Sequence, residues 1–188
     1  MNNKVNPKLI FLLFLVIALV AYIKFSNPYR KYSTRQYWES ATVEDVKNIP
    51  YEALKPMNKN GPVLMWAASA TRDPAVIRAL VDRGADINEK DVIFTGTPLS
   101  GAAGYNKSPE IIDELVRLGA EVNAQVGSDD KTPLIIAAEI NPNPEIIESL
   151  VRNGASTSYQ DKNGRNALEA ARKYGSSGVV TILERLTK

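Results

Sequence analysis

The sequence predicts an all-α fold in which helix pairs stack as a solenoid, preceded by a single apolar helix at the N-terminus. Two features of the 188-residue chain lead to this fold class. A set of short phrases recurs at a fixed period from about residue 60 to the end, which is the signature of a repeat array. In addition, an unbroken apolar run at residues 9–23 lies near the start of the chain, outside the repeats.

Three kinds of position keep the same spacing through the array. The first is a glycine followed by alanine, at intervals of 35 residues: Gly84, Gly119 and Gly154. The second is a leucine among small residues, at intervals of 35, 35 and 34: Leu64, Leu99, Leu134 and Leu168. The third is a polar residue before proline, again at intervals of 35: Asp73, Ser108 and Asn143. Three independent anchors at one period indicate a repeated structural unit.

Each unit carries the start and stop signals of two helices. Thr-Pro, at Thr97 and Thr132, predicts the start of a first helix, because proline suits the first turn and threonine can cap free backbone N–H groups. The polar residue before the next proline predicts the N-cap of a second helix. The second helix has an apolar stripe, which in one unit consists of Ile111, Ile112, Leu115 and Val116. The glycine of the Gly-Ala pair then ends this helix in a left-handed conformation.

These phrases resemble ankyrin repeats, whose pattern is T-P-L-H, then A-A, then L-L-x-x-G-A-D-V-N. The resemblance covers Asn60 to Lys188 and implies a curved stack of antiparallel helix pairs with protruding hairpin-like loops. The chain departs from the pattern where the family has histidine, and the residues found there are Met65, Ser100, Ile135 and Glu169. The hydrogen bonds that this histidine makes between repeats must therefore be replaced or lost.

The resemblance also predicts how the chain is divided. We expect repeats at about residues 60–91, 95–126, 130–161 and 164–188. Residues 32–59 should form a divergent N-terminal cap repeat. Within it, Tyr32 to Ile49 is interpreted as a helix pair, and a loop is expected from Pro50 to Lys59 because Pro50 stops the second helix. Residues 26–31 form a linker, and residues 1–25 hold the apolar segment.

The apolar run from Leu9 to Ile23 predicts a transmembrane anchor. As a helix its 15 residues span roughly 22 Å, less than the ~30 Å hydrocarbon core, but Lys8 and Lys24 can snorkel to the interface. A cleaved signal peptide and a buried core helix are the alternatives; the absence of an A-x-A site after the run favours the anchor. The short N-terminal tail favours a repeat domain on the non-cytoplasmic, periplasmic side. Cleavage would leave a secreted or periplasmic protein instead.

Composition excludes several classes of function. The chain has no cysteine and no histidine, which removes zinc sites of the Cys/His type, thiol nucleophiles and the commonest general base. No pair of acids stands out beyond solvated helix faces, so we expect no enzyme activity and no small-molecule substrate. Asp129 and Asp130 supply too few ligands for calcium, so no metal and no cofactor is expected. A net charge of +2 gives no sign of a nucleic-acid partner.

Candidate partner-binding residues lie in two places. Exposed positions of the first helices include three large side chains that an interface would favour: Tyr105, Ile140 and Tyr174. The alternative is that these three contact no partner. The second place is an apolar triplet at the tip of a loop, where polar residues are usual: Val92, Ile93 and Phe94. The triplet either folds back as a local core, docks into a partner as a wedge, or contacts a membrane. Trp66 is expected to pack in the core between first helices.

The resemblance to ankyrin repeats implies a non-catalytic module that binds another protein, whose identity no short motif encodes. Together with Leu9 to Ile23 it indicates a small bacterial ankyrin repeat protein with a signal-anchor, held at a membrane. One alternative is an inhibitor or immunity-type protein that neutralises an enzyme or toxin in the bacterial periplasm, by analogy at the level of the fold. Another is a structural scaffold of a membrane assembly.

Overall fold

The structure is a computed structural model that describes residues 29–54, 62–91 and 96–188. The chain divides into two units, Met1–Lys31 and Tyr32–Lys188, and only residues 29–31 of the first unit are described. The apolar run from Leu9 to Ile23, with the N-terminal helix and anchor predicted for it, lies outside the described residues. Among the residues that are described, none forms a helix with the length and apolarity that crossing a bilayer requires.

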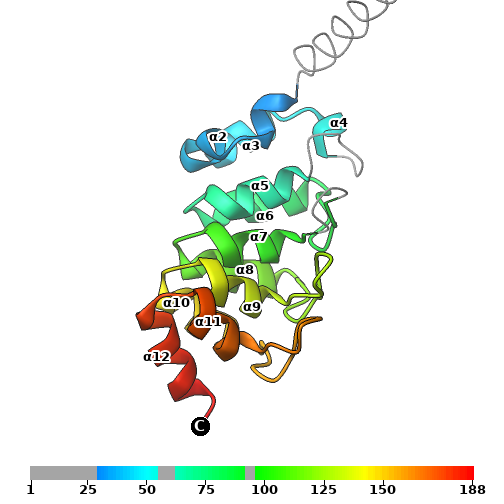
Figure 1. The fold of residues 1–188 in the computed structure, drawn as a ribbon. Helices are drawn as coiled ribbons and strands as arrows, with labels where there is room; N and C mark the ends of the chain where they lie inside the picture. Colours follow the sequence, from blue (N-terminus) through cyan, green and yellow to red (C-terminus); the bar gives the residue numbers. More distant parts are fainter. Residues whose placement is uncertain (1–28, 55–61, 92–95) are drawn as a thin grey trace, which may run out of the picture. The chain divides into compact units, whose positions relative to one another are not determined.

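The second unit is a stack of helix pairs, with the loops between pairs gathered on one side (Figure 1). The first helices of the pairs are α5 (Val63–Ala70), α7 (Pro98–Tyr105), α9 (Pro133–Ile140) and α11 (Ala167–Tyr174). The second helices are α6 (Pro74–Asp82), α8 (Pro109–Arg117), α10 (Pro144–Arg152) and α12 (Ser177–Leu186). Each helix contacts the helix of the same kind in the neighbouring pair, which is the stacking expected of a solenoid.

The described residues confirm the predicted all-α class. Apart from one isolated antiparallel bridge between Val126 and Lys131, their regular structure is entirely helical. The repeat period explains the core, because equivalent second-helix side chains are all fully buried: Ile77, Ile112 and Ile147, and Leu80, Leu115 and Leu150. Helices α6, α8 and α10 end as predicted at a left-handed glycine, with φ of 93°, 99° and 93° at Gly84, Gly119 and Gly154.

Four shorter helices precede the repeats: η1 (Arg30–Ser33), α2 (Arg35–Ser40), α3 (Val43–Lys47) and α4 (Tyr51–Leu54). Helix α2 contacts α5 and α3 contacts α6, so this pair extends both rows of the stack by one position. Trp38 of α2 is fully buried, and its indole Nε1 donates a hydrogen bond to the carbonyl oxygen of Tyr32 at 2.7 Å. The sequence predicted a loop where α4 lies. A single helical turn forms there and buries the side chains of Ala53 and Leu54.

Buried asparagines supply hydrogen bonds between repeats in this chain, which lacks the histidine of the family pattern. Asn106 and Asn141 follow α7 and α9 and are only 2% and 3% exposed. Asn141 Nδ2 donates to the carbonyl oxygens of Ala103 and Asn106 in the preceding repeat, at 2.9 and 2.8 Å. Asn106 makes the equivalent pair of bonds one repeat earlier, at 2.7 and 2.8 Å. These bonds satisfy carbonyl groups at the ends of the first helices. Ser100, at a histidine position, bonds only locally with Thr97.

Candidate interaction groove

The loops between repeats are held in hairpin-like form by backbone hydrogen bonds. Val126 and Lys131 exchange two such bonds, each of 2.9 Å. One repeat earlier, the backbone N–H of Asp91 donates to the carbonyl oxygen of Gly96 at 2.8 Å. One repeat later, the backbone N–H of Asp161 donates to the carbonyl oxygen of Arg165 at 2.9 Å. Because these closures recur at the repeat period, the loops line one side of the first helices (Figure 1).

Two hollows lie between the first helices and these loops. The first, here called the apolar hollow, has a volume of about 610 Å³, and its lining includes Met65, Trp66, Tyr105, Val126 and Ile136. The second, here called the charged hollow, has a volume of about 700 Å³, and its lining includes Lys131, Glu139, Ile140, Arg165, Lys173 and Tyr174. Asp129 and Lys131 line both hollows, so the two adjoin, and together they are called the groove here.

Helix α7 has a glycine at two positions where side chains of the neighbouring first helices approach closely. A Cβ atom at Gly101 would lie 2.8 Å from Ser69 Oγ and 3.1 Å from Met65 Cγ. At Gly104 it would lie 3.0 Å from Cδ1 of Ile140. Each glycine inside a helix costs roughly 0.5–1 kcal/mol relative to alanine. Close packing of the neighbouring side chains over α7 offsets this cost. Gly101 itself lines the apolar hollow together with Trp66 and Ile136, so α7 contributes no side chain at that position.

The prediction that Trp66 packs in the core is wrong, because its side chain is partly exposed and lines the apolar hollow. Trp66 occupies the same repeat position as Gly101 and Ile136, which also line that hollow. This repeat position therefore faces the same hollow in three successive repeats. The sequence did not indicate this, since a large aromatic side chain suits a core equally well.

The structure brings three of the predicted partner-binding residues to the groove. Tyr105, Ile140 and Tyr174 are the last residues of α7, α9 and α11, and they are 58%, 49% and 53% exposed. Tyr105 lines the apolar hollow, and the other two line the charged hollow. The other three predicted residues, Val92, Ile93 and Phe94, lie outside the described residues. A role in binding stays a prediction for all six.

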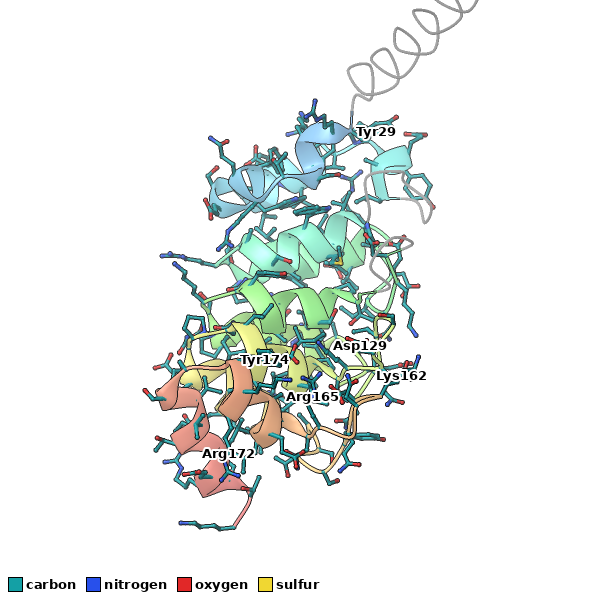
Figure 2. The ribbon with its side chains drawn as sticks, viewed as in Figure 1. Tyr29, Asp129, Lys162, Arg165, Arg172 and Tyr174 are labelled. Atoms are coloured by element: carbon teal, nitrogen blue, oxygen red, sulfur yellow. The ribbon has the colours of Figure 1, made fainter. Side chains whose placement is uncertain are left out.

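The charged hollow is built on two ion pairs whose carboxylates are buried. Lys131 Nζ lies 2.8 Å from Glu139 Oε2, and the Glu139 side chain is 11% exposed. Arg165 Nη2 and Nε lie 2.6 and 3.0 Å from Asp161 Oδ2, and Asp161 is fully buried. Arg165 Nη1 also donates to the hydroxyl of Tyr174 at 3.1 Å. Arg165 Nη2 also lies 3.8 Å from Glu139 Oε1 of the preceding repeat. The loops and first helices of two repeats therefore meet in the charged hollow (Figure 2).

The electrostatics of these pairs keep Asp161, Lys131 and Arg165 charged near neutral pH. Burial by itself would raise the pKa of Asp161. The backbone N–H and guanidinium of Arg165, together with the backbone N–H of Asn163, outweigh burial and lower that pKa to about 2. Burial would lower the pKa of Lys131, but its hydrogen bond to Glu139 leaves the pKa raised. The hollow thus carries fixed charges of both signs.

The two acidic residues of the neighbouring loop, Asp129 and Asp130, also lie beside cations. Asp129 lies 3.6 Å from Lys131, and Asp130 lies 3.4 Å from Lys162. Within the described residues no group of three or more acidic side chains is placed to hold a metal ion. The arrangement suits recognition of a polypeptide surface by contact, hydrogen bonding and charge.

The stacked pairs, the buried repeat core and the loop-lined groove define a helical-repeat solenoid. Two family models match the chain: ankyrin repeats (3 copies) over residues 99–185, and a single ankyrin repeat over residues 62–92. Together they cover more than half of the sequence, and the chain belongs to the ankyrin repeat family. The ankyrin resemblance is thereby confirmed. A search of the curated proteins finds no significant match.

Proposed function

We propose that this chain is a non-catalytic protein-binding module held at a membrane, and that the groove receives the partner. Ankyrin repeats indicate protein–protein interaction. The single observation that carries the choice of surface is the row formed by Tyr105, Ile140 and Tyr174. Large side chains that are about half exposed in three successive repeats, along one groove, are the anchors that interfaces favour. Val92, Ile93 and Phe94 are proposed as an additional wedge on the basis of their sequence.

The membrane part of the proposal is supported by the sequence. Leu9 to Ile23 is apolar throughout, with Lys4 and Lys8 before it. We further propose that the repeats lie on the non-cytoplasmic side. A module tethered in this way meets partners at or near the membrane surface, where a shared location raises their effective concentration.

One experiment tests both parts. The full chain is expressed in a bacterial host, membranes are washed at alkaline pH, and cross-linked partners are captured from the pellet. We expect the chain to stay in the pellet and to capture a defined protein. The triple variant Tyr105→Ala/Ile140→Ala/Tyr174→Ala should capture about tenfold less of the partner or lower still, because anchor residues carry most of the binding energy. Its thermal midpoint should fall by only a few degrees, since these side chains are about half exposed and a single hydrogen bond, from Arg165 to Tyr174, is lost.

The matched control is Tyr51→Ala/Tyr159→Ala, which removes two exposed tyrosines that do not line either hollow. This control should capture the partner as the parent chain does. Equal capture by the groove variant and the parent would refute the groove as the binding surface. Recovery of the chain in the alkaline wash would refute the anchor and leave the binding proposal in place.

A further inference from the structure

The charged hollow presents cations to a partner and holds its carboxylates beneath them. Glu139 and Asp161 are 11% and 0% exposed, whereas Lys131 and Arg165 are 22% and 19% exposed. Lys173 is exposed on α11 and has no carboxylate within ion-pair distance among the described residues. Its Nζ lies 5.0 Å from the centre of the Tyr174 ring. The charge within reach of an incoming group is therefore mainly positive, and the exception is Asp129, which lines both hollows and lies 3.6 Å from Lys131.

The unused hydrogen-bonding groups of the charged hollow also favour a negatively charged ligand. A guanidinium has five N–H donors, and the contacts of Arg165 with Asp161 and Tyr174 use three of them. A lysine ammonium has three N–H donors. Among the described residues, Lys131 uses one of them, in a hydrogen bond to Glu139. Oε1 of Glu139 is buried and has no hydrogen-bond partner among the described residues, with Arg165 Nη2 at 3.8 Å. Arg165 and Lys131 therefore keep N–H donors for an incoming acceptor group.

The apolar hollow adjoins the charged hollow. It shares Asp129 and Lys131 with the charged hollow, and Trp66, Tyr105 and Ile136 supply large apolar surfaces to it. Aromatic surfaces of this kind favour a bulky apolar side chain, because burial of its surface stabilises the complex. One extended segment of a partner can therefore reach both hollows.

We propose that the groove recognises a partner segment in which an acidic side chain lies close to a bulky apolar one. The carboxylate occupies the charged hollow and accepts hydrogen bonds from Lys131, Arg165 and Lys173. The apolar side chain occupies the neighbouring hollow between Trp66, Tyr105 and Ile136. This inference rests on the proposed function and specifies the chemistry of the partner that the groove selects.

Lys173 is the cation best suited to a test. Removing Lys131 or Arg165 would leave a buried carboxylate without its ion-pair partner, so loss of binding could reflect unfolding. Lys173 has no such partner, and the fold should tolerate Lys173→Met and Lys173→Glu. The matched control is Arg172→Met on the same helix. Arg172 pairs with Glu184 of α12 at 2.9 Å, and Figure 2 shows it apart from Arg165 and Tyr174.

The probe is a display library of random 12-residue peptides, selected on the full chain in detergent micelles. We expect the selected peptides to share an Asp or Glu near a Leu, Phe, Ile, Met or Trp. Their affinity should fall about fivefold in Lys173→Met and more than about tenfold in Lys173→Glu, because a charge-assisted hydrogen bond is lost and then replaced by repulsion. Arg172→Met should leave the affinity unchanged. The affinity should also fall with added salt.

Selected peptides that bind the groove but lack acidic residues, or that ignore the charge at position 173, would overturn this inference. A selection that yields no groove-dependent peptide would overturn it as well. Neither result touches the proposed function, which fails only if the full chain captures no protein or captures it independently of Tyr105, Ile140 and Tyr174.

Discussion

Replacing Trp38 with alanine should destabilise the α2–α3 pair by ~3–5 kcal/mol, the usual cost of removing a fully buried aromatic side chain. Trp38 has no exposed surface, and it is the only buried side chain of α2, the helix that contacts α5. The substitution also leaves the carbonyl oxygen of Tyr32 without the indole hydrogen bond of 2.7 Å. Because terminal repeats have neighbours on one side only, the loss should appear as local opening.

Amide hydrogen exchange of the full chain is the appropriate measurement. Protection should fall in α2 and α3 by two or more orders of magnitude and should change little in α9 and α10, which lie several helices away. Gln36→Ala is the control, because Gln36 is exposed on the same helix. Unchanged protection of α2 in the Trp38 variant would show that this pair does not depend on the buried indole.

Replacing Asp161 with asparagine should cost ~1–3 kcal/mol in the free energy of unfolding, because backbone N–H donors and the Arg165 guanidinium then lose the buried carboxylate that accepts their hydrogen bonds. The carboxylate accepts hydrogen bonds from the guanidinium of Arg165 and from the backbone N–H groups of Asn163 and Arg165. Asparagine has one acceptor oxygen where the carboxylate has two, and its NH₂ group would face donors. Urea unfolding of the full chain and the variant measures the difference. Asp130→Asn, which changes an exposed loop carboxylate, should cost less than ~1 kcal/mol.

The same variant has a defined pH dependence. The folded-state pKa of Asp161 is lowered to about 2, and an unfolded aspartate titrates near ~3.9. A lowered folded-state pKa contributes stability that is fully present above the unfolded value and is lost as pH falls through the folded value. The stability difference between the parent and Asp161→Asn should therefore be constant near neutrality and shrink between about pH 4 and pH 2. A difference that stays constant down to pH 2 would contradict the account of this pair.

The sequence predicts the repeat core well because its signals are local. Thr97 and Thr132 cap α7 and α9 as expected, with hydroxyls that accept from the backbone N–H groups three residues on. Ser108 does not cap α8 with its side chain, although the pattern predicted it. The turn does not explain the difference, because Asn106 Oδ1 accepts the backbone N–H of Ser108 just as Asn141 Oδ1 accepts that of Asn143, and Asn143 still caps α10.

The groove was predicted only in part. Tyr105, Ile140 and Tyr174 could be found because each holds the same position in its repeat, and all three prove to be exposed. The charged hollow could not be found in this way. Its ion pairs join Lys131 to Glu139 across eight positions, and Arg165 lies in a different repeat from Glu139. Such contacts depend on how loops fold over the first helices, which periodicity does not encode.

The central claim is that the groove, and not another face of the repeats, binds the partner. Hydroxyl-radical footprinting of the captured complex tests it most directly, because four exposed tyrosines report from different places. Tyr105 and Tyr174 are 58% and 53% exposed in the groove, and Tyr51 and Tyr159 are 59% and 43% exposed outside it. We expect labelling of the two groove tyrosines to fall several-fold in the complex and that of the other two to stay the same. Protection of Tyr51 or Tyr159, with Tyr105 and Tyr174 labelled as in the free chain, would contradict the claim.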